Sequence, residues 1–234
     1  MSSFTVTDGQ DPFLHISLER GESVFAESGA MVMMDGTLDL IGNVQGGLLS
    51  GLARRMVAGE SLFTQKIVAT RGPGDVLLSQ VIPGAVHVLN VGPQEYLLND
   101  GVFLAAETSV DIKVQPQGLG GALFANSGGL FIMRASGRGK LCVGGLGSLF
   151  LLPVEAGQNP IIDNGHLVAW DARLGYEVVM STSRQGGLLS NLISSQTSGE
   201  GWVTKFSGTG QVLICSRQRQ GFTAWLRQQI DSGS

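Results

Sequence analysis

A repeated arrangement of glycines and apolar runs constrains the fold of this chain more than any other sequence feature. The segment 127–143 aligns without a gap on 198–214, which is an offset of 71 residues (198 − 127). A first copy runs over 58–78, with a few extra residues around 69–72. Self-similarity at a fixed period is the signature of a chain built from one repeated supersecondary unit.

Two further elements recur in the same order upstream of each copy. One is a Gly-Gly pair with apolar neighbours, and the other is a turn dipeptide ending in glycine, with an acid six residues after that glycine. The pairs are Gly46-Gly47, Gly120-Gly121 and Gly186-Gly187; the turns are Ser28-Gly29, Asp100-Gly101 and Asn164-Gly165; the acids are Asp35, Glu107 and Asp171. We therefore predict one structural domain of three repeats of about 70 residues, at 1–83, 84–153 and 154–222.

The repeated segments have the character of β-strands. Asp-Gly and Asn-Gly are hairpin signals, because type I′ turns need positive φ at their central residues. A glycine followed by a short apolar run is typical of a strand buried in a core, and this pattern predicts core strands at 74–78, 139–143 and 210–214. Helix is expected only in the linkers after the Gly-Gly pairs and at 223–230, where Trp225, Leu226 and Ile230 form an apolar face that should dock on the sheet.

Composition and charge exclude several classes of protein. A net charge of −4 without a basic run argues against nucleic acid as a partner. The N-terminal residues lack the features of a signal peptide, so a cytoplasmic location is expected, and no apolar segment approaches the ~20 residues that span a bilayer. The two cysteines, Cys142 and Cys215, lie in apolar runs without a CxxC spacing, which indicates buried thiols rather than a disulfide or a zinc site.

Nearly the whole chain resembles a family of uncharacterised bacterial and archaeal proteins related to a mitochondrial biogenesis (altered inheritance of mitochondria) protein. The resemblance rests on the segments 46–49, 54–56 and 59–63 and on the later Gly-Gly-Leu-Leu copy. It implies a fold similar to that of the tryptophan RNA-binding attenuation protein (TRAP-like). Three fused β-sandwich units would then form a pseudo-threefold assembly. A shared fold does not transfer a function, and the resemblance implies no catalytic residue set.

The three repeated acids are the first candidate site. If symmetry brought Asp35, Glu107 and Asp171 to one axis, they would bind a cation such as Ca²⁺ or Mg²⁺. The alternative is that each carboxylate ends a strand and pairs locally with a turn amide or an arginine. Three histidines scattered along the chain do not form a metal triad, and no cofactor is implied. No Gly-x-Ser-x-Gly elbow or phosphate-binding loop is present, so an enzyme is the least favoured reading.

A second candidate lies in the first Gly-Gly linker. Its apolar side chains have helical spacing, and two arginines lie on another side. They are Leu48, Leu49, Leu52, Arg54 and Arg55. The linker either packs on the core or contacts a partner or a membrane surface. We expect a non-enzymatic scaffold that self-associates through sheet edges, or alternatively a protein that binds a small ligand or metal between its repeats.

Overall fold

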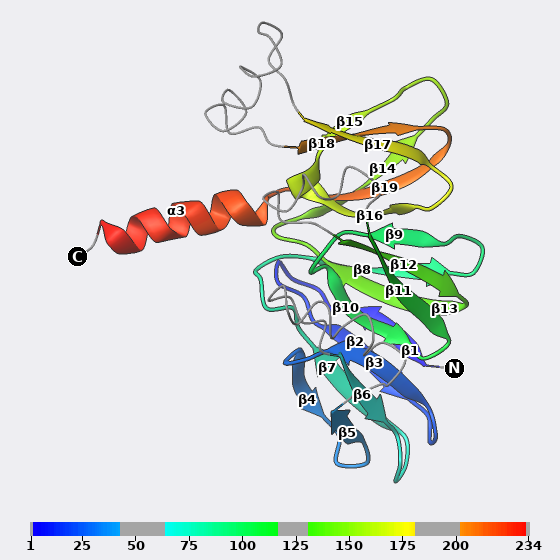
Figure 1. Cartoon of the computed structure of the whole chain (residues 1–234). Coiled ribbons are helices and arrows are strands. Elements are labelled where there is room, and N and C mark those ends of the chain that lie inside the picture. The colour runs from blue at the N-terminus through cyan, green and yellow to red at the C-terminus, as the bar shows by residue number, and fades with distance from the viewer. Residues whose placement is uncertain (1, 43–63, 117–130, 181–201, 233–234) are drawn as a thin grey trace, which may run out of the picture.

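The computed structural model describes residues 2–42, 64–116, 131–180 and 202–232, and these ranges form three β units in a row (Figure 1). Unit one contains β1 (Ser3–Val6), β2 (Leu14–Leu18), β3 (Ser23–Glu27), β4 (Met31–Met34), β5 (Asp39–Gly42), β6 (Thr64–Val68) and β7 (Gly74–Leu78). Unit two contains β8 (Val86–Val91), β9 (Tyr96–Leu98), β10 (Phe103–Glu107), β11 (Val110–Pro116), β12 (Phe131–Gly137) and β13 (Gly139–Gly144). Unit three contains β14 (Leu149–Val154), β15 (Ile161–Asp163), η2 (Asn164–His166), β16 (Leu167–Asp171), β17 (Gly175–Met180), β18 (Trp202–Ser207) and β19 (Gly210–Cys215). The chain continues into α3 (Arg219–Asp231), and the predicted all-β class with a C-terminal helix is confirmed.

The same pair of three-stranded layers occurs in every unit. One layer has the order β2-β7-β4, β8-β13-β10 or β14-β19-β16, and the other has the order β3-β6-β5, β9-β12-β11 or β15-β18-β17. The predicted core strands are the middle strands β7, β13 and β19, which explains their apolar runs. In unit one, Leu14 and Val76 from the first layer pack with Val24 and Ile67 from the second, and all four are fully buried.

Corresponding strand pairs share even their irregularities. β4 pairs with β7, β10 with β13 and β16 with β19, and each pair carries a register shift at the same place, after Met31, Phe103 and Leu167 respectively. A bulge inserts one residue and bends the strand. Because the bulge recurs at equivalent positions, the repeated sequence segments form the same strand pairs in the same register.

Each six-stranded sheet is shared between two units. β3 of unit one pairs with β10 of unit two, with Ala26 opposite Ala105, and β9 of unit two pairs with β16 of unit three, with Leu98 opposite Ala169. We call these two antiparallel pairings the first and second joints. They join the units edge to edge, so that the units follow one another along the row in Figure 1.

Two expectations concern the boundary between units two and three and the symmetry of the units. The boundary at 153 runs through β14, because Pro153 lies within that strand, opposite Gln211; proline is tolerated there because β14 is the edge of its sheet. The pseudo-threefold arrangement is not confirmed. In the described ranges the outer strands β4 and β15 lie at opposite ends of the row (Figure 1) and do not pair.

Candidate functional site

The C-terminal helix α3 projects away from the β body (Figure 1). It carries Phe222, Trp225, Leu226 and Ile230 at the spacing of one helix face. In the described structure no residue of this helix is buried, and the side chains of Trp225 and Ile230 are 54% and 63% exposed. The prediction that this helix docks on the sheet is therefore wrong: the spacing identifies an apolar face but not its partner.

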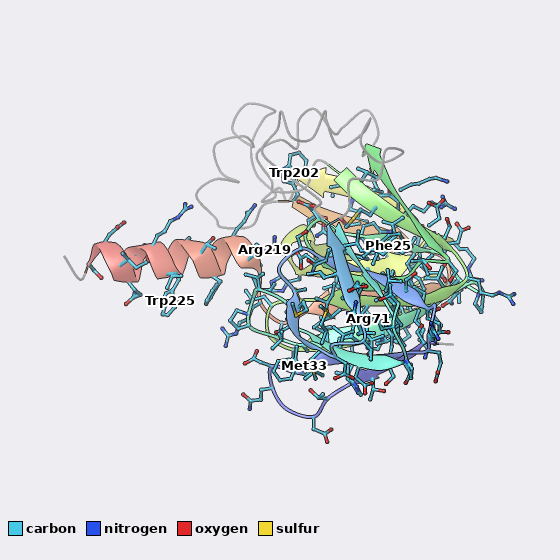
Figure 2. All side chains as sticks on the ribbon, turned by 90° about the horizontal axis from the view of Figure 1, so that it is seen from below. Phe25, Met33, Arg71, Trp202, Arg219 and Trp225 are labelled. Carbon is cyan, nitrogen blue, oxygen red and sulfur yellow. The ribbon has the colours of Figure 1, made fainter. Side chains whose placement is uncertain are left out.

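Aromatic stacking organises the apolar face of α3. The rings of Phe222 and Trp225 lie 6.1 Å apart between centroids at an interplanar angle of 30°, a geometry that contributes about 0.5–1.5 kcal/mol beyond area burial. The Trp225 side chain stands clear of the body in Figure 2. We call Phe222, Trp225, Leu226 and Ile230 the α3 stripe. Its exposure is typical of a surface that binds a partner.

Arg219 anchors the first turn of α3 to the body. Its guanidinium Nη2 donates a hydrogen bond of 2.9 Å to the carbonyl oxygen of Gly101, in unit two. Figure 2 shows Arg219 at the root of the helix, where α3 leaves the units. The side chain thus fixes the point from which the helix departs.

Two small hollows adjoin Arg219. One, of about 230 Å³, lies beside the first joint and is lined by Glu27, Gln80 and Leu104, among others. The other, of about 160 Å³, lies beside the second joint and is lined by Asn99, Asn164 and Cys215, among others. Both are smaller than the ~300 Å³ at which pockets for small organic ligands begin.

Glu27 is the carboxyl in the first hollow whose titration is perturbed. Burial raises the pKa of Glu27 above its ordinary value, and the Arg219 guanidinium acts in the opposite direction. A perturbed acid beside a fixed cation in a hollow is a candidate for binding a small polar group. The pair has no signature in the sequence, because Glu27 ends β3 in unit one, Arg219 begins α3, and the two share no motif.

The three repeated carboxylates occupy equivalent positions in three separate units, at the ends of the corresponding strands β4, β10 and β16. Asp35 accepts a 2.8 Å hydrogen bond from the backbone N–H of Asp75, and Glu107 accepts one of 2.9 Å from the N–H of Lys140. Asp171 is buried and pairs with Arg173 Nη2 at 2.6 Å. Side-chain hydrogen bonds from Arg173 lower the pKa of Asp171. Each carboxylate therefore has a local partner.

The structure does not bring these acids together as a cation site. Within the described ranges there is no group of three or more His, Cys, Asp or Glu side chains able to hold a metal ion. The repeated glycines explain why the acids recur: a methyl group added at Gly139 would lie 2.5 Å from Glu107 Oε2. The acid and the glycine therefore pack directly against each other, and we call this contact the corner.

Histidines and cysteines are tied to the scaffold. His15 Nε2 lies 3.0 Å from Asp75 Oδ1, and His166 Nδ1 lies 2.7 Å from the carbonyl oxygen of Cys215. Burial lowers the pKa of His87. Burial raises the pKa of both Cys142 and Cys215, most strongly at Cys142. A raised thiol pKa disfavours the thiolate that acts as a nucleophile.

The linker candidates lie outside the described residues. Leu48, Leu49, Leu52, Arg54 and Arg55 fall within 43–63, as do the Gly-Gly pair and the helical turns expected after it. Across the ranges that are described, no helix is long and apolar enough to span a membrane.

Comparison with known proteins places the chain in a family. A family model described as Mitochondrial biogenesis AIM24 matches residues 4–217. The chain belongs to this family. An uncharacterised protein of Streptococcus pyogenes serotype M6 is 33% identical over 231 residues, covering 96% of this chain and 89% of the relative. The X-ray structure of protein SPYM3_0169 from Streptococcus pyogenes, also 33% identical, matches with a TM-score of 0.78 over 97% of this chain and 99% of that one.

The family resemblance expected from the glycine motifs is thereby confirmed. The AIM24 match covers all three units and ends two residues before α3 begins. The β body is therefore the part of this chain that the family model describes, whereas the α3 stripe lies beyond it.

Proposed function

We propose that this AIM24 family protein is a non-enzymatic interaction, or scaffold, protein that uses α3 to bind a protein partner. The observation that carries the proposal is the α3 stripe, an ordered apolar helix face with no buried residue in the described structure. A helix that is polar on one face and apolar on the other gains stability chiefly by burying the apolar face. Binding a groove on a partner would bury it, as amphipathic helices do in other complexes.

The charge of α3 favours a protein over a membrane surface. Membrane-surface helices are rich in Lys and Arg on the polar face. The polar residues of α3 are mostly Gln and Thr, with Arg219 tied to the body and Arg227 offset by Asp231. Little electrostatic attraction to anionic lipid is left.

The body supports a scaffold role more than an enzymatic one. The two hollows beside Arg219 are small, the described histidines are engaged or buried in separate units, and burial raises the pKa of both thiols. The family description names a cellular process and no reaction. These features agree with a β body that serves as a rigid support for α3.

The experiment that tests the proposal uses a photo-crosslinking amino acid placed on α3 in cells of the source organism. At position 225, in the stripe, it should give defined crosslinked protein bands. At position 224, which is exposed on the opposite face of the helix, it should give none. Equal crosslinking from both positions, or crosslinks from 225 to lipid alone, would contradict a protein partner for the stripe.

A small-ligand function is the second candidate, and the Glu27–Arg219 hollow favours it. A ligand of a few atoms with a hydrogen-bond donor and an acceptor would suit an acid of raised pKa facing a guanidinium. Thermal-shift screening of small polar metabolites tests this candidate. A ligand that raises the melting temperature of the wild type but not of Glu27→Gln would support it.

A further inference from the structure

Two strands at the ends of the row lack a neighbour that their counterparts possess. β4 corresponds to β10 and β16, and β15 corresponds to β3 and β9, as judged by their places in the repeated layers. In the first and second joints these two kinds of strand pair with each other. Among the described strands, β4 and β15 are each hydrogen-bonded on one side only.

The other sheet edges differ from β4 and β15 in how often their counterparts are paired. β5, β11 and β17 are edges in all three units. β8 and β14 are edges in units two and three, and their counterpart β2 is covered by β1 in unit one alone. An edge that is open in every unit is a constant of the fold. β4 and β15 are the two described edges whose counterparts are paired in both of the other units.

The register of the missing pairing can be derived from the two joints. In the first joint Ala105 lies opposite Ala26 and Ala106 opposite Phe25; in the second, Ala169 lies opposite Leu98 and Trp170 opposite Leu97. The equivalent residues are Met33 and Met34 in β4, from the shared bulge, and Ile162 and Ile161 in β15, from the pairing with β18. The same register therefore places Met33 opposite Ile162 and Met34 opposite Ile161.

Burial at these positions differs sharply between the joints and the ends. Leu104 and Val168 are both 0% exposed, whereas their counterpart Val32 is 54% exposed. Leu97 in the second joint is 5% exposed, whereas its counterpart Ile161 is 62% exposed. The two ends therefore present apolar side chains of the kind that the joints bury, on unpaired edges that template further pairing.

We propose that β4 of one copy pairs antiparallel with β15 of a second copy, with Met33 opposite Ile162 and Met34 opposite Ile161, so that the chains join head to tail. The occupant is a second copy rather than the other end of the same chain, because the two strands lie at opposite ends of the row (Figure 1). Such a contact is heterologous, so it repeats with every added copy. This inference names a partner for the interaction protein proposed above and rests on that proposal, although it uses a surface separate from α3.

The first experiment crosslinks two different chains. Met34→Cys and Ile161→Cys chains are purified separately, mixed and oxidised mildly; the wild type is the background, since its Cys142 and Cys215 are buried. A disulfide should form between the two variants at least about tenfold faster than between Met34→Cys and Asp163→Cys, which shifts the register by two residues, because disulfide geometry is narrow. Equal rates for the two mixtures would overturn the register.

A single chain carrying both Met34→Cys and Ile161→Cys tests the choice of occupant. Interchain pairing should give a ladder of covalent multimers on a non-reducing gel. A compact monomer with an intrachain disulfide would show that the chain closes on itself, which would overturn the proposal of a second copy.

The second experiment measures mass in solution by light scattering. The wild type should exceed the monomer mass, and Val32→Lys on β4 should return it to the monomer. Ile41→Lys is the matched control, because Ile41 is 49% exposed on β5, an edge in every unit, and its mass should stay that of the wild type. A monomeric wild type at high concentration, or equal loss of mass in both variants, would overturn the edge pairing.

Trp225→Gln separates this inference from the proposed function. If the edges join the copies, the Trp225→Gln protein keeps the wild-type mass while the stripe loses its partner. If the mass falls with Trp225→Gln and not with Val32→Lys, the stripe carries self-association, and the edge inference fails while the proposed function stands.

Discussion

Gly139→Ala tests whether the repeated glycine and the repeated acid form one structural corner. Gly139 has a φ of +156°, and an added methyl would meet Glu107 Oε2 at 2.5 Å and Ser109 Oγ at 2.9 Å. A strained backbone conformation costs about 1–3 kcal/mol. Displacing the carboxylate from the N–H of Lys140 adds roughly 1.5–3 kcal/mol, as for hydrogen bonds to charged groups.

The expected loss for Gly139→Ala is therefore about 2.5–6 kcal/mol. In a chain of this length, 1 kcal/mol corresponds to roughly 2–4 °C in melting temperature, so the variant should melt about 5 °C or more below the wild type. Circular dichroism at a β-sheet wavelength, followed with temperature, measures this difference.

Gly36→Ala is the matched control for this experiment. Gly36 lies one residue after Asp35, the corresponding acid of unit one; its φ is ordinary, and nothing lies within 4 Å of an added methyl. Removing a glycine from such a position stabilises by about 0.4–1 kcal/mol. A Gly139→Ala protein that melts within about 1 °C of Gly36→Ala would refute the corner.

Glu107→Ala then separates the two costs of Gly139→Ala. Because the shortened side chain leaves room for the methyl, Gly139→Ala should cost at least about 1 kcal/mol less in the Glu107→Ala background than in the wild type. Strictly additive losses would show that backbone strain alone accounts for the effect and that Glu107 takes no part.

Three further predictions concern charge, thiol reactivity and the helix. Asp171→Asn should lower the melting temperature at pH 7 by roughly 2–6 °C. Because the pKa of Asp171 is lowered in the folded state, its carboxylate stabilises the fold above the unfolded pKa of about 3.9, and this stabilisation is lost as pH falls through the folded pKa. The difference in melting temperature between Asp171→Asn and the wild type should therefore shrink below pH 4. Cys142 should resist a thiol-specific reagent at pH 8 in the native state and react in denaturant, and labelling of native Cys142 within minutes would contradict its burial. Ile230→Gln should leave the melting temperature within about 1 °C of the wild type, since Ile230 is 63% exposed, and a larger fall would mean that the stripe already packs on the body.

Local signals in the sequence predicted the strands well. A glycine followed by an apolar run located β7, β13 and β19, because a middle strand of a sheet must be apolar and its first residue must fit against the corner acid. Pro153, which suggested the boundary at 153, lies within β14, since an edge strand does not need the missing N–H. Periodicity therefore identified the elements more reliably than their limits.

The relations between units had no such local signature. The joints pair Ala26 with Ala105 and Leu98 with Ala169, residues more than 70 positions apart in each case, and no motif marks one as the partner of the other. The repeat showed that Asp35, Glu107 and Asp171 are equivalent, but equivalent residues meet only where the repeats close into a ring around a common axis. In a row, equivalent residues stay one unit apart, and the candidate cation site depended on that distinction.

The shared register of the two joints also bears on how such a chain can change in length. Unit one presents β3 and unit three presents β16 in the same manner as their counterparts in unit two, so removal of unit two would leave Phe25 and Ala26 facing Trp170 and Ala169 in the register that the joints already use. Gene duplication or deletion of one whole unit would therefore preserve every type of strand pairing. The strand pairing at a joint therefore does not depend on how many units the gene encodes.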